Sequence, residues 1–389
     1  MLAASSPRVL FYVQHLLGIG HLRRAALLVE GWQRAGLDVA VVLGGLPVAG
    51  ITFGSARVYQ LPPLQAADAD FSALVDPQGQ ALSEPFKQGR RQQLLALLAQ
   101  EQPDILMLET YPFGRRQLRW ELLPLLELAD QLRPRPLICS SVRDILQRRK
   151  PEREAETLAL IAQYFDRVQV HGDPAFVTLP ESVPGCSAIA QCLDYTGYVT
   201  DSRQPDYRPQ SDAEVVVSAG GGAVGFELLR CAIESRPLGP LSDRVWRVLL
   251  GPNVSPEARR KLAQLASDRV VLESVRPDFT DLLSRCALSI SQGGYNTLMD
   301  LLGAGCPAVV VPFEGQGETE QRMRCDKLAA AGVVTAVNET ELTPQRLAMA
   351  ITRALHQRRQ PLTLARDGAR RSAALLIQRW QQYRSANGS

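Results

Sequence analysis

Short apolar runs recur along the chain, separated by longer segments in which apolar residues repeat at helical spacing. Such runs are typical of buried strands. In the first half they predict strands at residues 8–13, 38–43, 57–61, 104–108, 137–141 and 167–170. In the second half they predict strands at residues 214–218, 246–250, 269–273, 288–291 and 308–311. Strands that alternate with helices form parallel sheets, so the pattern predicts an α/β protein.

The segment after the first strand is predicted to be a helix that starts at His21, because Leu22, Ala25 and Val29 recur on one helical face. Further helices are predicted at residues 84–101, 320–332 and 362–383. A polar segment with prolines, residues 198–212, separates the two strand series and is typical of a linker. We therefore expect one domain at residues 1–200, a second at 213–361 and a terminal helix within 362–389.

Length and composition agree with two domains of ordinary size. The chain has 389 residues, of which 46% are hydrophobic and 21% charged, and its net charge is +3. So small a net charge gives no reason to expect a nucleic-acid partner. The seven cysteines show no C-x-x-C spacing, which is typical of buried thiols in a reducing compartment. No apolar run approaches the roughly 20 residues of a spanning helix. We therefore expect a cytoplasmic protein and leave open a peripheral contact with the inner face of a membrane.

Residues 288–313 carry the strongest candidate chemistry. The predicted strand at their start is followed by Gly293-Gly294, where a backbone can approach a ligand closely. Asn296 and Thr297 then begin a helix, whose free N–H groups form an anion site. Asp300 lies one turn further, within reach of a sugar hydroxyl. A phosphate beside a ribose indicates a nucleotide. The alternative at this point is a plain strand-to-helix turn with a capping Asn or Thr.

A second polar segment follows the next strand. Residues 314–319 form a glycine-containing loop, and Glu320-Gln321 opens another helix. This loop is predicted to lie at the carboxyl edge of the sheet, where α/β proteins bind ligands. Together the two segments resemble the donor-binding region of GT-B glycosyltransferases. The resemblance is to the MurG-like family, of the glycosyltransferase family 28 C-terminal domain type, and to bacterial predicted glycosyltransferases.

This resemblance implies a GT-B fold, in which two Rossmann-like domains with parallel sheets face a central cleft and a terminal helix crosses back onto the first domain. It also implies that the Gly-Gly turn holds a diphosphate, that Asp300 binds ribose and that Glu320-Gln321 binds the donor hexose. Arg324 stands where the family often has Asn. The expected nucleotide-sugar-binding residues are Gly20, Gly220, Gly221, Gly222, Val275, Gln292, Gly293, Gly294, Asn296, Thr297, Asp300, Glu320 and Gln321.

The loop after the first strand, Gly18-Ile19-Gly20-His21, matches the Gly-x-Gly-His form that the MurG-like family has at this place. The resemblance makes His21 the candidate catalytic base. A structural alternative exists, since an imidazole at a helix start can simply hydrogen-bond a nearby carbonyl.

Polar residues also follow other predicted strands of the first half. They are expected at the carboxyl edge of the sheet, where α/β proteins bind ligands. Three such clusters, at residues 109–111, 143–144 and 171–173, are expected to face the acceptor, and Glu109 and Asp144 are the further catalytic candidates. The structural alternatives are an ion pair of Glu109 with Arg115 or Arg116 and a turn capped by Asp144.

Two other motifs, one for a nicotinamide cofactor and one for a metal, lack the surroundings that their chemistry needs. Residues 220–225 fit G-x-G-x-x-G after a strand, as in nicotinamide enzymes. The next strand, however, is followed by Gly251-Pro252-Asn253, so the carboxylate that would hold the ribose is missing. Asp68-Ala69-Asp70 matches the D-x-D metal motif of the other large glycosyltransferase fold, but it lies in a loop between elements and is short enough to occur often by chance.

The sequence therefore predicts a hexosyltransferase that moves a sugar from a UDP-sugar to the hydroxyl of a glycan, lipid or small-molecule acceptor. Transfer is expected to invert the anomeric carbon and to need no metal or other cofactor. In this hypothesis His21 removes the acceptor proton, and N–H groups around Gly294 stabilise the leaving UDP. One alternative is a UDP-sugar 2-epimerase of the same fold, which would be expected to have paired glutamates after the Gly-Gly turn. The other is a non-catalytic sugar-nucleotide binding protein, which would have no use for His21.

Overall fold

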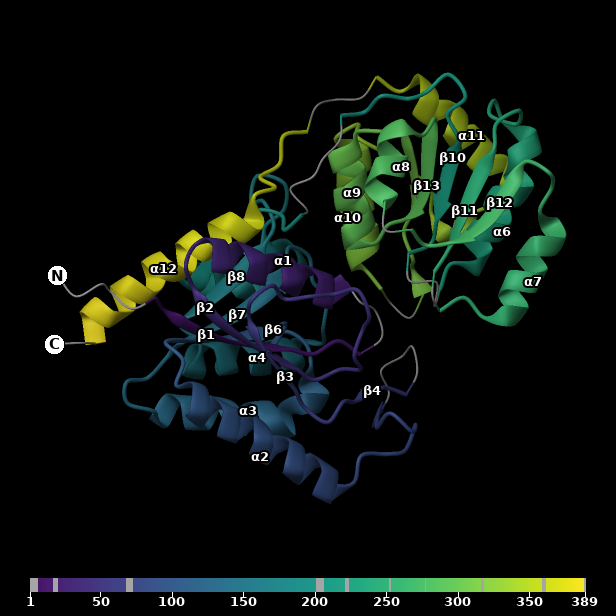
Figure 1. Ribbon diagram of the computed structural model, residues 1–389. Coiled ribbons are helices and arrows are strands. Elements are labelled where there is room, and N and C mark those ends of the chain that lie inside the picture. The colour runs from purple at the N-terminus through teal and green to yellow at the C-terminus, as the bar shows by residue number, and fades with distance from the viewer. Residues whose placement is uncertain are drawn as a thin grey trace. The chain divides into compact units, whose positions relative to one another are not determined.

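The computed structural model describes residues 6–16, 20–67, 73–200, 206–220, 224–251, 253–276, 278–315, 318–358 and 362–387. The chain divides into two compact units (Figure 1). The first unit is made of residues 1–200 and 364–389, and the second of residues 201–363. Each unit is built on one parallel sheet, and the two are described separately.

The sheet of the first unit has seven parallel strands in the order β3-β2-β1-β6-β7-β8-β9. These strands are β1 (Arg8–Val13), β2 (Asp38–Leu43), β3 (Arg57–Gln60), β6 (Ile105–Glu109), β7 (Leu137–Arg143), β8 (Arg167–His171) and β9 (Leu193–Tyr195). A separate antiparallel pair consists of β4 (Gln65–Ala66) and β5 (Leu74–Val75). The strand order reverses between β1 and β6. The carboxyl ends of these two strands therefore flank the switch point, where open α/β sheets bind ligands.

Helices cover both faces of this sheet (Figure 1). They are α1 (Gly20–Arg34), α2 (Glu84–Glu101), α3 (Arg119–Gln131), α4 (Pro151–Tyr164), α5 (Leu179–Ser182) and α12 (Gly368–Asn387), with 3₁₀ turns η1 (Arg116–Leu118) and η2 (Pro184–Cys192). Successive side chains of β1 point to opposite faces of the sheet and pack in two different hydrophobic cores. Phe11 packs with Trp32 of α1, whereas Tyr12 packs in a second core with Leu94 of α2. Because β1 is buried on both faces, its sequence is apolar throughout rather than alternating.

The C-terminal helix α12 packs on α1 in the first unit. Trp32 Nε1 donates to Ser372 Oγ at 2.8 Å, and Gln169 Nε2 of β8 donates to the Ser372 carbonyl at 3.1 Å. A Cβ at Gly31 would lie 2.8 Å from the Cβ of Ala369, so glycine at this position lets the two helices approach closely. The helix is therefore part of the core of the first unit, in which Leu376 is buried.

This helix begins at Gly368 rather than at residue 362, where the sequence predicts its start. The residues before it pair with the chain that follows β9. The Tyr198 N–H donates to the Ala365 carbonyl at 2.7 Å, and Val199 forms a bridge with Asp367. Tertiary pairing has thus replaced the first turns that the amphipathic pattern alone predicts.

The second unit contains a six-stranded parallel sheet in the order β12-β11-β10-β13-β14-β15. Its strands are β10 (Val215–Ser218), β11 (Trp246–Leu250), β12 (Val270–Ser274), β13 (Leu288–Gln292), β14 (Ala308–Val311) and β15 (Thr335–Ala336). Its helices are α6 (Phe226–Ser235), α7 (Pro256–Leu265), α8 (Phe279–Arg285), α9 (Tyr295–Ala304), α10 (Glu320–Ala330) and α11 (Pro344–His356), with 3₁₀ turns η3 (Arg236–Leu238) and η5 (Glu339–Glu341). The strand order reverses between β10 and β13, so their carboxyl ends flank a second switch point.

Every strand predicted from an apolar run is present within two residues of its expected bounds, and the α/β prediction is confirmed. The strands that the sequence missed, β4, β5, β9 and β15, have only two or three residues, too few for a recognisable pattern. Over the part of the chain that the structure describes, no helix is both long and apolar enough to cross a membrane.

Candidate active site

The switch point of the first unit brings His21 and Glu109 together. β1 and β6 are parallel neighbours, with Tyr12 opposite Leu108. Glu109 is the last residue of β6, and His21 lies in the first turn of α1, which follows β1. Two residues that are 88 positions apart in the chain therefore meet at the carboxyl edge of one sheet.

The two side chains are in direct contact, because His21 Nδ1 lies 2.6 Å from Glu109 Oε1. The same oxygen accepts a hydrogen bond from Arg24 Nη2 at 2.7 Å and another from Thr110 Oγ1 at 2.6 Å. Glu109 is 1% exposed, whereas the imidazole of His21 is 22% exposed. The carboxylate is thus held inside the unit, and the imidazole remains within reach of a ligand.

The surroundings determine which of the two groups carries charge. Burial raises the pKa of Glu109, but His21, Arg24 and Arg115 outweigh it and hold the pKa well below its usual range. Burial lowers the pKa of His21 to about 3, against the opposing effect of Glu109. At neutral pH an ionised Glu109 thus faces a neutral imidazole. Nδ1 then carries the proton and donates a hydrogen bond to the carboxylate. Nε2 keeps a lone pair that can accept a proton.

The backbone after β6 is strained where it holds this pair. Thr110 and Arg115 have φ of 64° and 61°, in the left-handed region that residues other than glycine rarely adopt. The Gly114 N–H donates to the Thr110 carbonyl at 2.8 Å and closes the loop. Such conformations persist where surrounding contacts fix them, often at functional sites. Here the hydroxyl of Thr110 is one of the three donors to Glu109 Oε1.

Asp144 follows β7 in the interior of the first unit. It is fully buried, and its Oδ2 accepts a hydrogen bond from the Tyr198 hydroxyl at 2.9 Å. A Cβ at Gly172 would lie 2.4 Å from the Cβ of Asp144, so only glycine fits against it. The sequence proposed either a catalytic carboxylate or a turn cap at this position. The structure shows a buried carboxylate that accepts a hydrogen bond from a tyrosine, and both readings stay predictions.

The third strand-end cluster is also held by contacts within the unit. His171 Nε2 lies 2.7 Å from Ser141 Oγ, and its Nδ1 lies 2.9 Å from Thr196 Oγ1. Asp173 Oδ2 accepts a hydrogen bond from the Ala365 N–H at 2.8 Å. Of the three clusters that were expected to face the acceptor, the one containing Glu109 is the one in contact with His21.

The sequence predicted neither the contact of Arg24 with Glu109 nor that of Thr110, although Thr110 belongs to the cluster expected to face the acceptor. Arg24 lies three residues after His21 on α1, a spacing that places both side chains on one helical face and could have revealed it. The contact with Thr110 has no such signal. The structural alternative of a pair with Arg115 is present in part, since Arg115 Nη2 lies 3.7 Å from Glu109 Oε2. Arg116 instead pairs with Glu156 of α4 at 3.2 Å.

In the second unit, the turn after β13 combines tight packing with open space. A Cβ at Gly293 would lie 2.4 Å from Cys325 Sγ of α10, so this position requires glycine. A Cβ at Gly294 would meet no atom within 4 Å. Gly294 is the N-cap of α9, whose first intrahelical bond runs from the Leu298 N–H to the Gly294 carbonyl. The Gly293 and Gly294 N–H groups donate to the Val311 and Gln292 carbonyls, so the N–H groups without an intrahelical acceptor are those of the first turn of α9, beside the open side of Gly294.

The remaining predicted donor-site residues of this turn are partly accessible. Asn296 and Thr297 lie in the first turn of α9, Asp300 lies in the next turn, and all three are partly exposed. Gln292 at the end of β13 is 9% exposed. This arrangement places a carboxylate about one turn from a helix N-terminus, as the sequence predicted.

Side chains at the start of α10 fix the loop after β14. Gln321 Oε1 accepts a hydrogen bond from the Phe313 N–H at 3.1 Å. Glu320 is 7% exposed, and its N–H donates to Glu318 Oε1 at 2.6 Å. Arg324 is fully buried, and its guanidinium carbon lies 5.3 Å from the centre of the Tyr295 ring at the start of α9. The residue at the position where the family often has Asn thus packs against the first residue of α9, where the sequence predicts an anion site.

The other residues predicted to bind the nucleotide sugar lie on different elements. Val275 follows β12, is 43% exposed, and donates its N–H to the Leu250 carbonyl at 3.1 Å. Gly220 follows β10 with a φ of +66°, a conformation that suits glycine. Gly20 is the first residue of α1 and therefore belongs to the first unit. Gly18, Gly221, Gly222, Asp68 and Asp70 lie outside the described residues.

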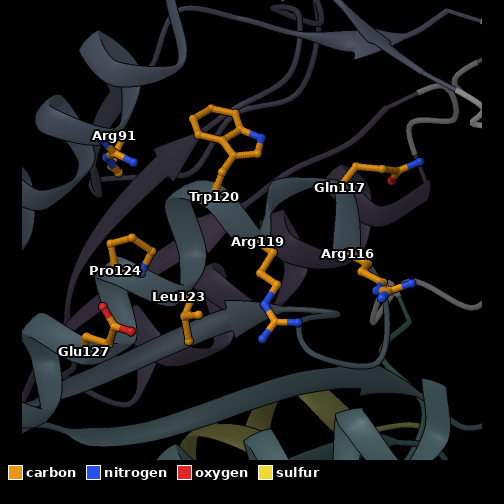
Figure 2. A pocket seen from close by; sticks show the side chains of 8 residues that line it. All are labelled: Arg91, Arg116, Gln117, Arg119, Trp120, Leu123, Pro124 and Glu127. Carbon is orange, nitrogen blue, oxygen red and sulfur yellow. The ribbon is translucent and has the colours of Figure 1, made fainter. Parts of the chain in front are cut away.

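A pocket of about 510 Å³ opens on the first unit between α2, η1 and α3 (Figure 2). It is lined by Arg91, Arg116, Gln117, Arg119, Trp120, Leu123, Pro124 and Glu127. Arg116 and Arg119 both pair with Glu156. None of the predicted site residues lines this pocket. In the parts of the chain that are described, no group of three or more His, Cys, Asp or Glu side chains is arranged to hold a metal ion.

Most of the second unit and part of α12 match a known family model. Residues 215–380 match the model of the glycosyltransferase family 28 C-terminal domain. One similar curated protein is the UDP-N-acetylglucosamine--N-acetylmuramyl-(pentapeptide) pyrophosphoryl-undecaprenol N-acetylglucosamine transferase of Rhodopseudomonas palustris (strain BisA53). It is 28% identical over 170 residues, which are 43% of this chain and 45% of that protein. The matched region thus spans about half the length of the curated relative.

Solved structures extend the likeness of fold to the whole chain. The glycosyltransferase of kitacinnamycin has a TM-score of 0.66 and 16% identity, over 97% of this chain and 100% of that chain. MurG of Acinetobacter baumannii has a TM-score of 0.57 and 16% identity, over 96% of this chain and 100% of that chain. The predicted resemblance is confirmed: the chain has the GT-B fold, and its residues 215–380 are similar to the family 28 C-terminal domain.

Proposed function

We propose that this MurG-like chain transfers a hexose from a UDP-sugar to an acceptor hydroxyl, with His21 as the general base. The observation that carries the proposal is the 2.6 Å contact of His21 Nδ1 with Glu109 Oε1 at the switch point of the first unit. A non-catalytic nucleotide-sugar binder has no need for a buried carboxylate that fixes the tautomer of a partly exposed imidazole. The similarity to a transferase that acts on a UDP-sugar supports this class of donor.

The proposed reaction is a single displacement at the anomeric carbon. The acceptor oxygen forms the new bond to this carbon, the bond from the carbon to the phosphate oxygen breaks, and UDP leaves with the electron pair. His21 Nε2 takes the acceptor proton, and the ionised Glu109 stabilises the imidazolium that forms. Attack opposite to the leaving group inverts the configuration.

The second unit supplies the groups proposed to hold the donor. A diphosphate at the N-terminus of α9 would accept hydrogen bonds from the N–H groups of the first turn, beside the open side of Gly294. These groups are fixed before the reaction and can stabilise charge that develops on the leaving UDP. Asp300 is proposed to bind ribose, and Glu320 to bind the hexose. In this proposal no metal or other cofactor takes part.

Glu109 acts in this proposal as the partner of the base rather than as the base itself. Its pKa lies well below its usual range, and Arg24 and Thr110 occupy the oxygen that also contacts His21. Asp144 has no proposed contact with substrate because it is fully buried against Tyr198. The acceptor is proposed to be a glycan, a lipid or a small molecule, and binding near a membrane surface stays a prediction.

The function is tested with a thermal-shift panel of UDP, dTDP and NAD, followed by assays with UDP-hexoses. A ligand that binds only the folded protein raises the melting temperature by mass action. We expect UDP to give the largest shift and a UDP-hexose to release UDP when an acceptor is added. Stabilisation by NAD but not by UDP would exclude the proposal. Conversion of UDP-N-acetylglucosamine to its 2-epimer without an acceptor would favour the epimerase instead.

A further inference from the structure

Thr110 adopts a backbone conformation that its residue type disfavours. It follows Glu109 directly at the end of β6, and its φ of 64° lies in the left-handed region. A branched Cβ makes this region costly, whereas glycine adopts it freely. Two backbone hydrogen bonds hold the conformation: the Thr110 N–H donates to the Ser141 carbonyl at 2.9 Å, and the Gly114 N–H donates to the Thr110 carbonyl at 2.8 Å. A glycine would make the same bonds at lower cost, so the backbone alone gives no reason for a threonine here.

The methyl group of Thr110 occupies the space beside Gly114. A Cβ at Gly114 would lie 2.7 Å from Thr110 Cγ2, which is too close for two carbon atoms. Threonine carries two heavy atoms on its Cβ, so a fixed methyl group also fixes the direction of the hydroxyl. With the methyl group against Gly114, Thr110 Oγ1 donates to Glu109 Oε1 at 2.6 Å. The loop thus directs this hydroxyl at the carboxylate that contacts His21.

Glu109 needs more than one donor to keep its carboxylate in one orientation, because the terminal torsion of a glutamate is broad. Its Oε1 accepts from Arg24 at 2.7 Å and lies 2.6 Å from His21 Nδ1. Its Oε2 is buried and has no hydrogen-bond partner among the described residues, and Arg115 Nη2 lies 3.7 Å from it. A rotation of the carboxylate toward Arg115 would give Oε2 a partner and draw Oε1 away from His21. The hydroxyl of Thr110 opposes this rotation without adding charge.

We infer that Thr110 is a positioning residue, whose strained backbone directs its hydroxyl to Glu109 Oε1. Glu109 thereby holds the ring of His21 with Nδ1 protonated and Nε2 free to accept a proton. Thr110 acts on His21 through Glu109 and is not itself proposed to touch a substrate. The inference rests on the proposed function only in giving this orientation a catalytic purpose. If Thr110 instead only packs in the loop, its hydroxyl is dispensable.

The first test measures the orientation of His21 without any turnover. The full chain has 4 histidines, so NMR signals of their ring nitrogens can be assigned by comparison with His21→Gln. At neutral pH we expect His21 of the wild type to be a single neutral tautomer with its proton on Nδ1. Thr110→Val removes the hydroxyl and keeps the shape, so it should give nitrogen shifts averaged between the two tautomers, whereas Thr110→Ser should keep the wild-type shifts. Unchanged His21 signals in Thr110→Val would overturn the inference.

The second test separates the hydroxyl from the backbone. Thr110→Gly removes both the hydroxyl and the strain, whereas Thr110→Val removes the hydroxyl alone. We expect both variants to lower kcat about tenfold or more, as the loss of a hydrogen bond to a charged group implies, and Thr110→Ser to stay close to the wild type. Thr110→Gly should nevertheless melt at a higher temperature than Thr110→Val. Turnover that follows the melting temperature rather than the hydroxyl would show that Thr110 only shapes the loop.

Gln102 provides a matched control for the backbone. It is exposed at the C-cap of α2, with a φ of 40°, and lies outside the proposed site. Gln102→Gly should raise the melting temperature without changing kcat, because glycine relieves the same kind of strain at a position that orients no catalytic group.

The space beside Gly114 allows a test that keeps the hydroxyl. Gly114→Ala places a Cβ against the methyl group of Thr110 and should lower kcat by turning the hydroxyl away from Glu109. The double variant Thr110→Ser/Gly114→Ala removes that methyl group and should recover most of the lost turnover. A double variant as slow as Gly114→Ala would contradict the role given to the methyl group.

The failure of this inference can be told apart from failure of the proposed function. Binding of UDP and release of UDP from UDP-hexoses are measured first, on the wild type. If the wild type does neither, the nucleotide-sugar proposal fails, and the ring nitrogen signals of Thr110→Val still decide whether the hydroxyl orients His21. If Thr110→Val does not fold, the signals of Thr110→Gly decide instead.

Discussion

His21 donates from Nδ1 to Glu109 Oε1 across 2.6 Å, and this contact leaves the opposite ring nitrogen with its lone pair. Glu109 is 1% exposed and His21 is 22% exposed, so the carboxylate fixes the ring while the ring remains within reach of a substrate. The relationship has the form of an oriented general base.

Replacing His21 should separate catalysis from donor binding. We expect His21→Ala to lower kcat by about 10²- to 10⁴-fold, with little change in the dissociation constant of UDP, because the proposed donor site lies in the second unit. Arg23→Ala, at an exposed position of the same helix, is the control. Turnover, UDP affinity and melting temperature are measured on one preparation. A variant that loses stability but keeps its turnover would show that His21 only anchors the loop.

Asp300 should matter for nucleotide binding and hardly at all for folding. Loss of a charge-assisted hydrogen bond to ribose should cost about 1.5–3 kcal/mol of UDP binding. Asp300→Ala should therefore lose most of the thermal shift that UDP produces, while its melting temperature without ligand stays close to that of the wild type. Asp281→Ala, an exposed position of α8, provides the control. An undiminished UDP shift in Asp300→Ala would remove Asp300 from the site.

Turnover should persist in excess EDTA, because the proposed stabilisation of the leaving UDP comes from helix N–H groups. The measurement is the initial rate before and after dialysis against EDTA, and again after addition of Mn²⁺ or Mg²⁺. A strict requirement for either ion would restore Asp68 and Asp70 as candidates.

The stability of the protein should fall in mild acid. Burial lowers the pKa of both His21 and His171 to about 3, from an ordinary value of 6.5. Between these values each histidine binds a proton in the unfolded chain but not in the folded one, so the free energy of unfolding increases with pH in this window. Each contributes a slope of at most about 1.4 kcal/mol per pH unit.

This pH dependence is checked by chemical unfolding between about pH 4 and about pH 6, a range that lies between the folded and the ordinary pKa of the histidines. His171→Gln should show a shallower decrease than the wild type as the pH falls. An identical slope in both proteins would contradict the assignment of a neutral, buried His171. The comparison uses slopes, because the substitution also removes the contacts of His171 with Ser141 and Thr196.

The buried pair of Arg90 and Glu121 should be strongly coupled. Both side chains are fully buried, and Tyr12 and Gln14 at the end of β1 hydrogen-bond to them. Removing one partner leaves a buried charge, so Arg90→Met and Glu121→Met should each cost about 3–5 kcal/mol of stability. The double variant should lose much less than the sum. Unfolding free energies of all four proteins give the coupling directly, and additive losses would show that the pair acts as two independent groups.

The sequence alone determined the longer strands and the α/β class of the fold. Strands such as residues 8–13 and 308–311 were predicted at their observed bounds, because a strand buried on both faces leaves a continuous apolar run. The turn at Gly293-Gly294 was equally visible, and the structure supplies its cause: Cys325 fills the space that a Cβ at Gly293 would need. Such features are local, so a single stretch of sequence contains them.

Tertiary structure decided which polar residues meet. His21 and Glu109 come together because the strand order reverses between β1 and β6, and no local pattern specifies that order. Asp144 also follows a strand of the same sheet, and no local pattern distinguishes the two carboxylates. In the folded chain Asp144 is buried against Tyr198, whereas Glu109 contacts a partly exposed histidine. The difference arises from side-chain direction and long-range packing, which depend on the whole sheet rather than on the residues beside each carboxylate.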